Sequence, residues 1–347
     1  MAGPNLDDLR SRTADLRGIA DVRLVALEDG PGRGKRLLLC RNGCGLELEI
    51  SVDKGFDVSA LRWRGLNLGW NSPVGGGVPA INLEAEDGLG LLRSFDGFMV
   101  TCGLDHYGAP GVGAASHFNY PLRSHIHRPL HGRISSVPAT LRGYGIDLAG
   151  KEPRIWCEAE LRQATLFAEV LELRRRIEMP LFEPLIRIKD SVTNIGWQAT
   201  RHATLYHFNL GFPLVDGQSV LTGSFGKDVV SEFAAAPPVA KRDAVETFEL
   251  NRSRANSAGW AHAGLFNPRL DRGVRLEIAY SAATLPELGL WRAYQSGVYA
   301  VGLEPCSGIA TDEGYQGPGT PHYLEPGEIR RYEFEICVGE ENLLGQT

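Results

Sequence analysis

The segment Leu205-Tyr206-His207-Phe208-Asn209-Leu210-Gly211 decides the fold class, because the polar residues His207 and Asn209 alternate with large, mainly apolar ones. Successive side chains of a β-strand point to opposite faces. One face therefore carries Leu205, His207 and Asn209, and the other carries the large, mainly apolar residues between them. A polar face opposite an apolar one is typical of a strand that packs on a core and lines a cavity.

The same alternation recurs along the chain, which indicates that strands make up most of it. It occurs in Leu46-Glu47-Leu48-Glu49-Ile50, in residues 275–280 and in residues 331–336. The 347 residues include 42 glycines and 20 prolines without low-complexity repetition. Such frequent turn residues favour many short strands. The sequence therefore predicts an all-β protein.

The domain organisation is predicted to be simple. Residues 1–20 contain Leu6, Leu9 and Leu16 with charges between them, and we expect a helical or extended lead-in there. Residues 21–340 show no composition shift and no internal repeat, so we expect one large domain.

Composition narrows the class of partner. A formal net charge of −6 argues against a nucleic-acid surface, which needs a clustered basic face. No basic-then-apolar leader and no apolar run of ~18 residues is present, so we expect no membrane partner and a cytoplasmic protein. The six cysteines form no CxxC pair, which predicts reduced core residues. The expected partner is a small molecule.

A second segment, Tyr299-Ala300-Val301-Gly302-Leu303-Glu304-Pro305, also places one proton-transfer group among apolar neighbours. Burial and mutual charge can tune a His and a Glu towards neutral pH. His207 and Glu304 are therefore candidates for an acid–base pair that faces one cleft from opposite sides of a small molecule. The alternative is that each is a hydrogen-bonded structural group.

The stretch from Thr101 to Leu130 is rich in glycine and histidine, and it is predicted to be a long loop that covers a site. His125, His127 and His131 can point to one side of an extended segment. A divalent metal on these histidines is possible but not favoured, because no carboxylate lies nearby in sequence. Hydrogen bonding to a polyhydroxylated ligand is the favoured interpretation. The run 174–176, three arginines, is expected to be a solvated face.

Four segments carry a resemblance to a known family: 91–98 (LLRSFDGF), 130–134 (LHGRI), 206–211 (YHFNLG) and 302–305 (GLEP). In this order the chain resembles the aldose 1-epimerase (galactose mutarotase) superfamily over roughly residues 20–340. It looks closest to a bacterial epimerase-like branch described as a domain of unknown function. The resemblance implies a large antiparallel β-sandwich with few short helices, a carbohydrate ligand and no cofactor.

The resemblance also implies residue roles. His207 would protonate the ring oxygen of a sugar, Glu304 would remove the anomeric proton, and Arg93 and His131 would hold hydroxyls. The chain departs from the family pattern where Gly132-Arg133 follows His131, and no match for a hydroxyl-binding Asp is evident.

Five further residues complete the predicted substrate site. Arg133 is expected to orient hydroxyls, and Asn209 shares the polar face of His207. His125 and His127 are included as polar groups of the histidine-rich segment. Trp291 could offer an aromatic plate to a sugar, although a core position is the favoured interpretation because large aromatic residues mostly pack in cores.

Three functions are compatible with these features. The first is an aldose 1-epimerase-like enzyme that interconverts sugar anomers by His/Glu acid–base catalysis. The second is an isomerase or lyase that abstracts a proton from an oxidised keto sugar, with or without a metal on the histidines. The third is a non-catalytic carbohydrate-binding module, which would not need both His207 and Glu304.

Overall fold

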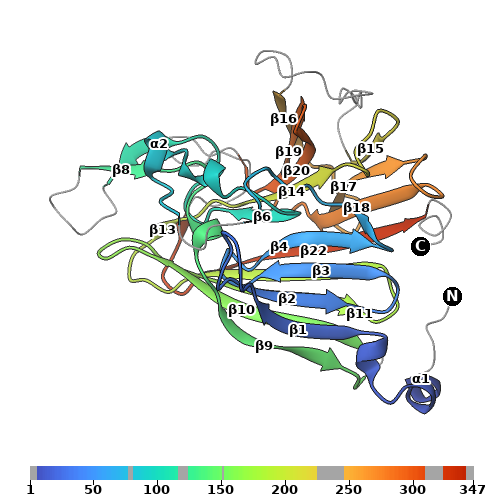
Figure 1. Ribbon diagram of the computed structural model, residues 1–347. Helices are drawn as coiled ribbons and strands as arrows, with labels where there is room; N and C mark the ends of the chain where they lie inside the picture. Colours follow the sequence, from blue (N-terminus) through green and yellow to red (C-terminus); the bar gives the residue numbers. More distant parts are fainter. Residues whose placement is uncertain are drawn as a thin grey trace.

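Two large antiparallel sheets packed face to face form the body of the protein (Figure 1). The computed structural model describes residues 6–76, 81–115, 124–150, 152–224, 246–308 and 323–340. Its helices are short, α1 (Leu6–Arg12) and α2 (Ala85–Gly88), with single 3₁₀ turns at η1 (Leu16–Gly18), η2 (Gly90–Arg93) and η3 (Ile134–Ser136). The predicted all-β sandwich with few short helices is confirmed.

The first sheet has ten strands in the described part of the chain. Its order is β1 (Asp21–Ala26), β2 (Arg36–Arg41), β3 (Leu46–Ser51), β4 (Asp57–Trp63), β6 (Met99–Cys102), β14 (Leu205–Gly211), β20 (Val298–Cys306), β19 (Glu287–Gln295) and β16 (Glu246–Arg252). The two-residue strand β5 (Leu66–Asn67) pairs with β4. Segments about a hundred residues apart in sequence, β6, β14 and β20, are therefore direct neighbours at the centre of this sheet.

The second sheet has eight strands in the described residues. Its order is β15 (Val220–Gly223), β17 (Trp260–Asn267), β18 (Val274–Ser281), β22 (Ile329–Glu340), β12 (Leu185–Asn194), β11 (Val170–Pro180), β10 (Arg154–Ala164) and β9 (Thr140–Asp147). Two small ribbons accompany the sheets, β7 (Gly111–Ala114) with β8 (His125–Arg128) and β13 (Thr200–Arg201) with β21 (Tyr323–Leu324). In Figure 1 the β8 strand and α2 lie together at one end of the sandwich.

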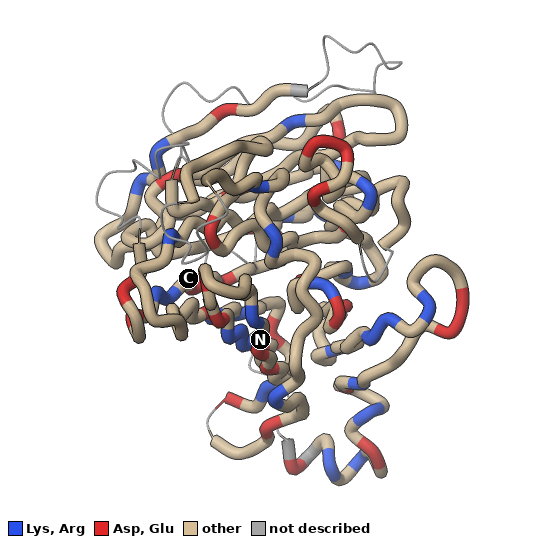
Figure 2. Tube along the Cα trace, turned by 90° about the vertical axis from the view of Figure 1, so that its left-hand side faces the viewer, with Lys and Arg blue, Asp and Glu red and all other residues tan. Residues whose placement is uncertain are grey.

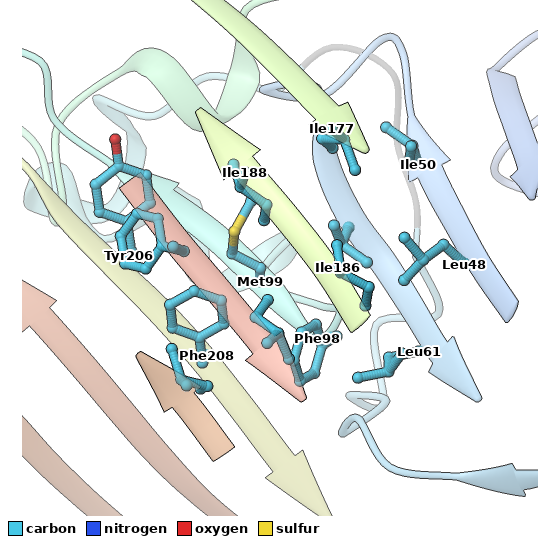
Figure 3. Close-up of a cluster of buried hydrophobic side chains, with 14 of the residues drawn as sticks. Leu48, Ile50, Leu61, Phe98, Met99, Ile177, Ile186, Ile188, Tyr206 and Phe208 are labelled. Carbon is cyan, nitrogen blue, oxygen red and sulfur yellow. The ribbon is translucent and has the colours of Figure 1, made fainter. Parts of the chain in front are cut away.

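The core fills the space between the sheets. Figure 3 shows Tyr206 and Phe208 of β14 together with Ile186 and Ile188 of β12, and all four side chains are buried. The ring of Phe208 also contacts Phe334 of the eight-stranded sheet, with ring centroids 5.5 Å apart. The apolar face predicted for residues 205–211 is therefore the face that packs on the core, and its polar face is turned away from the second sheet.

A buried arginine connects the two sheets. The side chain of Arg175, on β11, is 0% exposed and bonds to Asp190 of its own sheet at 2.6 Å. It also donates to Asp57 of β4 at 2.9 Å and to the hydroxyl of Thr101 on β6 at 2.8 Å. The hydroxyl of Tyr206 donates to Asp190 at 2.8 Å. This network joins strands of both sheets directly beneath β14.

The prediction of a solvated arginine face is wrong for Arg175. Strand alternation puts Arg174 and Arg176 on the outer face, where they pair with glutamates such as Glu172 and Glu178, and turns Arg175 into the core. A buried guanidinium is tolerated here because the two aspartates neutralise it and its donors are hydrogen-bonded.

The described residues show the distribution of charge and the state of the cysteines, of which Cys44 and Cys337 are half-buried rather than core residues as expected. Basic and acidic residues are interspersed along the chain in the view of Figure 2. All six cysteines are free thiols. No helix in the described residues has the length and apolar character of a membrane span. The boundary between a lead-in and a main domain at residue 20 stays a prediction.

We expect Arg175→Ala to lower the free energy of unfolding by about 3–5 kcal/mol, because Asp57 and Asp190 would remain buried without their cation. Arg174→Ala is the matched control, since that side chain is 58% exposed and should cost no more than about 1 kcal/mol. Urea unfolding measures both values. Equal losses in the two variants would contradict a special role for the buried network.

Candidate active site

His207 and Glu304 meet on the outer face of the ten-stranded sheet. The register of β14 and β20 pairs Leu205 with Cys306 and Phe208 with Leu303, so His207 stands opposite Glu304. Their side chains touch, with His207 Nε2 3.0 Å from Glu304 Oε1. His207 is 5% exposed and Glu304 is 2% exposed. The expected pair is present, but the two groups lie side by side rather than across a gap.

Two glycines make room for this pair. A Cβ atom added to Gly302 would lie 2.7 Å from His207 Cε1 and 3.0 Å from Glu304 Oε1. A Cβ atom added to Gly289, the β19 residue that pairs with Glu304, would lie 2.8 Å from the ring of Phe248. Glycine at these positions lets the side chains lie low over the sheet.

The pair lies in the wall of a cavity of about 660 Å³. The lining comes from the sheet and from the loops above it: Trp70, Ser72, Pro73, Val74, Leu92, Phe95, Tyr107, Gly108, Ala109, Leu130, His131, Leu205, His207, Phe248, Leu250, Trp291, Val298, Glu304 and Cys306. Residues 107–109 and 130, from the stretch predicted to be a long loop over a site, line the cavity, but the described part of that stretch also contains β7 and β8 and the end of β6. An apolar concave cavity with a few converging polar groups is typical of a small-molecule site.

Aromatic rings hold His207 in place. Phe95 packs edge-on against it with centroids 4.9 Å apart, and Trp291 does so at 5.6 Å. His131 is also edge-on to it, at 5.8 Å. Trp70 packs against both Phe95 and Trp291, at 6.4 and 6.3 Å. These contacts restrict the orientation of the imidazole ring.

An unusual backbone conformation sets the position of the His131 side chain. Its φ of +57° is left-handed, which is uncommon for a residue other than glycine. The next residue, Gly132, allows the turn because any Cβ there would lie 2.3 Å from the carbonyl oxygen of Gly103. Burial, and secondly the nearby His207, lower the pKa of His131 to about 4, so it is a neutral imidazole at pH 7.

The electrostatics keep Glu304 ionised. Burial alone would raise the pKa of this carboxyl group, but the adjacent His207 opposes it by charge and by hydrogen bonding, so that the pKa lies below its ordinary value. A carboxylate only accepts hydrogen bonds, so His207 Nε2 must carry the hydrogen of the 3.0 Å contact. His207 Nδ1 is buried and has no hydrogen-bond partner in the described structure.

This arrangement can move protons. Glu304 carries a carboxylate, and His207 has one buried ring nitrogen, Nδ1, without a hydrogen-bond partner in the described structure. A carboxylate and an imidazole in contact can exchange a proton between themselves, and each can also exchange one with a bound molecule. Such a pair can serve as a general acid and a general base.

Four of the nine predicted site residues line the cavity: His207, Glu304, His131 and Trp291. Arg93 does not. It ends η2, whose neighbours Leu92 and Phe95 point into the cavity, and its own side chain is 70% exposed and paired with Glu86. The structure thus does not bring Arg93 to the ligand.

Three other predicted residues line a second cavity of about 790 Å³, beside α2 and the β7–β8 ribbon: His125, His127 and Arg133. Arg133 donates to Glu84 at 2.7 Å and to the carbonyl oxygen of His127 at 2.7 Å. His131 lines the first cavity instead, so the three histidines do not converge. No cluster of metal-ligating side chains occurs in the described residues.

Asn209 is fully buried beneath the site rather than in its wall. Its amide donates to the carbonyl oxygen of Gly97 at 2.9 Å, which ties β14 to the segment before β6. Sequence reasoning missed several lining residues, above all Trp70, Phe95, Tyr107 and Phe248. Phe95 lies within a segment that carries the family resemblance, and Tyr107 lies within the stretch predicted to cover a site, whereas Trp70 and Phe248 had no signal in the sequence.

A family model described as a domain of unknown function, DUF4432, matches residues 32–338. The chain belongs to this family. A comparison with curated proteins found no match.

Solved structures share the fold. One is a putative aldose 1-epimerase from Klebsiella pneumoniae, with a TM-score of 0.77 and 21% identity over 91% of this chain and 83% of that one. A galactose mutarotase-like protein from Clostridium acetobutylicum has a TM-score of 0.62 and 13% identity over 93% and 99%. Galactose 1-epimerase from Lactobacillus acidophilus has a TM-score of 0.56 and 14% identity over 92% and 99%. The resemblance to this superfamily is confirmed at the level of the fold.

We expect Gly302→Ala to separate the pair, because the new methyl group would overlap His207 Cε1 and Glu304 Oε1. A crystal structure of the variant should show His207 Nε2 and Glu304 Oε1 beyond hydrogen-bonding range, ~3.5 Å. Gly145→Ala is the control, since a Cβ there meets nothing closer than 3.7 Å. An unchanged His207–Glu304 contact would show that Gly302 is not required.

We also expect stability to fall as the pH is lowered from about 6.5 towards about 4. Burial lowers the pKa of both His131 and His202 from 6.5 to about 4. In that window the unfolded chain binds protons that the folded chain excludes, so their contribution is complete above 6.5 and is lost as the pH falls. Urea unfolding at pH 7, 6 and 5 measures the slope, and His202→Gln should reduce it. A slope that His202→Gln leaves unchanged would refute this assignment.

Proposed function

We propose that this protein is an aldose 1-epimerase-like isomerase that interconverts sugar anomers with His207 and Glu304 as acid and base. The contact between His207 Nε2 and Glu304 Oε1 inside a ligand-sized cavity carries the proposal. The fold shared with proteins named as epimerases and mutarotases supports it.

Side-by-side groups suit this reaction. The anomeric hydroxyl and the ring oxygen are bonded to the same carbon, so acid and base need not lie across the ring. The Glu304 carboxylate takes the anomeric proton while a protonated His207 gives its Nδ1 proton to the ring oxygen. The bond from the anomeric carbon to the ring oxygen then breaks, rotation follows, and closure on the other face reverses both transfers.

Ring closure restores the starting protonation states of His207 and Glu304. After ring opening Glu304 is a carboxylic acid and His207 is a neutral imidazole. Closure returns each proton to its donor without a solvent molecule, in a cavity whose walls are mainly apolar. No external oxidant, reductant or cofactor is needed for the proton balance.

Two neighbours would hold the sugar. His131 is neutral, and because its Nδ1 accepts a long hydrogen bond of 3.4 Å from the Gly108 amide, its Nε2 is left as a donor to a hydroxyl. Trp291 would place its ring beside a C–H face of the sugar. The metal-assisted lyase loses its structural basis because His125 and His127 lie in a different cavity from His131.

We expect His207→Ala and Glu304→Gln each to lower kcat for anomer interconversion by ~10²- to 10⁴-fold, because each removes one proton-transfer group. Polarimetry or NMR exchange spectroscopy on a panel of hexoses measures the rate. His131→Ala should raise KM as well, because its proposed part is to bind hydroxyls.

The chain offers a matched control. His262 and Glu277, on β17 and β18 of the other sheet, form a similar pair with Nδ1 2.9 Å from Oε1, but they are about one-third exposed. His262→Ala and Glu277→Gln should leave the rate unchanged. A wild-type protein that binds sugars but accelerates no interconversion would favour the binding module instead.

A further inference from the structure

We propose that the substrate is an uncharged reducing sugar that carries an apolar substituent away from its anomeric carbon. The inference rests on the proposed function and concerns the same cavity. Its basis is the distribution of apolar side chains around Glu304 and His207.

The apolar side chains are ordered by the sheet register. Leu250 of β16 pairs with Gly289 of β19, and Gly289 pairs with Glu304 of β20. These three residues form one cross-strand row on the outer face. Neighbouring strands are roughly 4.8 Å apart, so Leu250 lies roughly 10 Å from the Glu304 backbone, about one sugar ring further along.

Phe248 extends the same surface. It pairs with Trp291, and its ring lies over Gly289, where a Cβ atom would come within 2.8 Å of it. The Phe248 side chain is nevertheless 55% exposed, and Leu92, which also lines the cavity, is 54% exposed. Large apolar side chains that are exposed together at the mouth of a cavity mark a binding surface.

The size of the cavity fits a ligand with more than one part. Its volume of about 660 Å³ lies in the middle of the range of about 300–1,000 Å³ for drug-sized ligands. His207 and Glu304 are on β14 and β20, Val298 begins β20, and Phe248 and Leu250 are on β16, two strands beyond β20. A sugar ring over His207 would place its far substituents against this apolar surface.

Desolvation selects against anionic sugars. A phosphate or carboxylate on the substrate would lose hydration against Leu250 and Phe248, which line the cavity. A benzyl or alkyl group would bury apolar area there instead.

The test compares D-glucose, 6-O-benzyl-D-glucose and D-glucose 6-phosphate, with the same three forms of D-galactose, as substrates for anomer interconversion. We expect kcat/KM for the benzyl ether to exceed that for the parent sugar at least about 10-fold, since one buried methylene group already gives discrimination of this order. The 6-phosphate should be the poorest of the three.

Variants of the apolar surface locate the preference. Leu250→Ser and Phe248→Ser should bring the benzyl-to-parent ratio of kcat/KM close to one. Val220→Ser is the control, because Val220 is an exposed apolar residue on β15, the edge strand of the other sheet. Its ratio should equal that of the wild type.

The outcomes separate the two proposals. If no sugar is interconverted faster than in buffer, the proposed function fails, and this inference falls with it. If parent sugars or 6-phosphates are turned over as well as the benzyl ethers, the function stands and the apolar-substituent inference is overturned. A benzyl preference that survives both Leu250→Ser and Phe248→Ser would also overturn it.

Discussion

The buried guanidinium of Arg175 is the interaction on which the rest of the structure depends. It connects Asp190 in one sheet with Asp57 and Thr101 in the other, and Tyr206 is hydrogen-bonded to the same Asp190. Such a network specifies position more than it adds stability, because its members are satisfied in one arrangement only. Tyr206 immediately precedes His207 on β14. The hydrogen bond of Tyr206 therefore fixes the position of the strand whose other face carries His207, the candidate acid.

The register of the strands above the Arg175 network forms the candidate active site. Two strands from distant parts of the sequence bring His207 and Glu304 opposite each other, and Gly302 leaves the space in which they touch. Aromatic rings then restrict the imidazole, and a mainly apolar cavity strengthens the interaction of its charges. A preorganised pair of this kind costs little reorganisation when a proton is transferred.

The local sequence pattern was sufficient to predict the fold class and part of the candidate site. Alternation around His207 predicted both a strand and the division of its faces, and the resemblance of ordered motifs predicted the sandwich. The contact between His207 and Glu304 was not predictable, because the register of strands joined only through tertiary structure has no local signal. Arg93 matched a motif by order, yet the 3₁₀ turn gives the inward positions to its neighbours. Arg175 resembled its solvated neighbours, and the aspartates that neutralise it are remote in sequence.

The central claim is that His207 and Glu304 act as one proton-transfer unit, with the free ring nitrogen of His207 facing the ligand. Long-range ¹H–¹⁵N correlation of the His207 imidazole, with and without sugar, tests it most directly. The account predicts a protonated Nε2 near neutral pH, a shift at that nitrogen in Glu304→Gln, and a change at Nδ1 when sugar binds. A tautomer with the hydrogen on Nδ1 alone, or an Nδ1 signal indifferent to sugar, would contradict it.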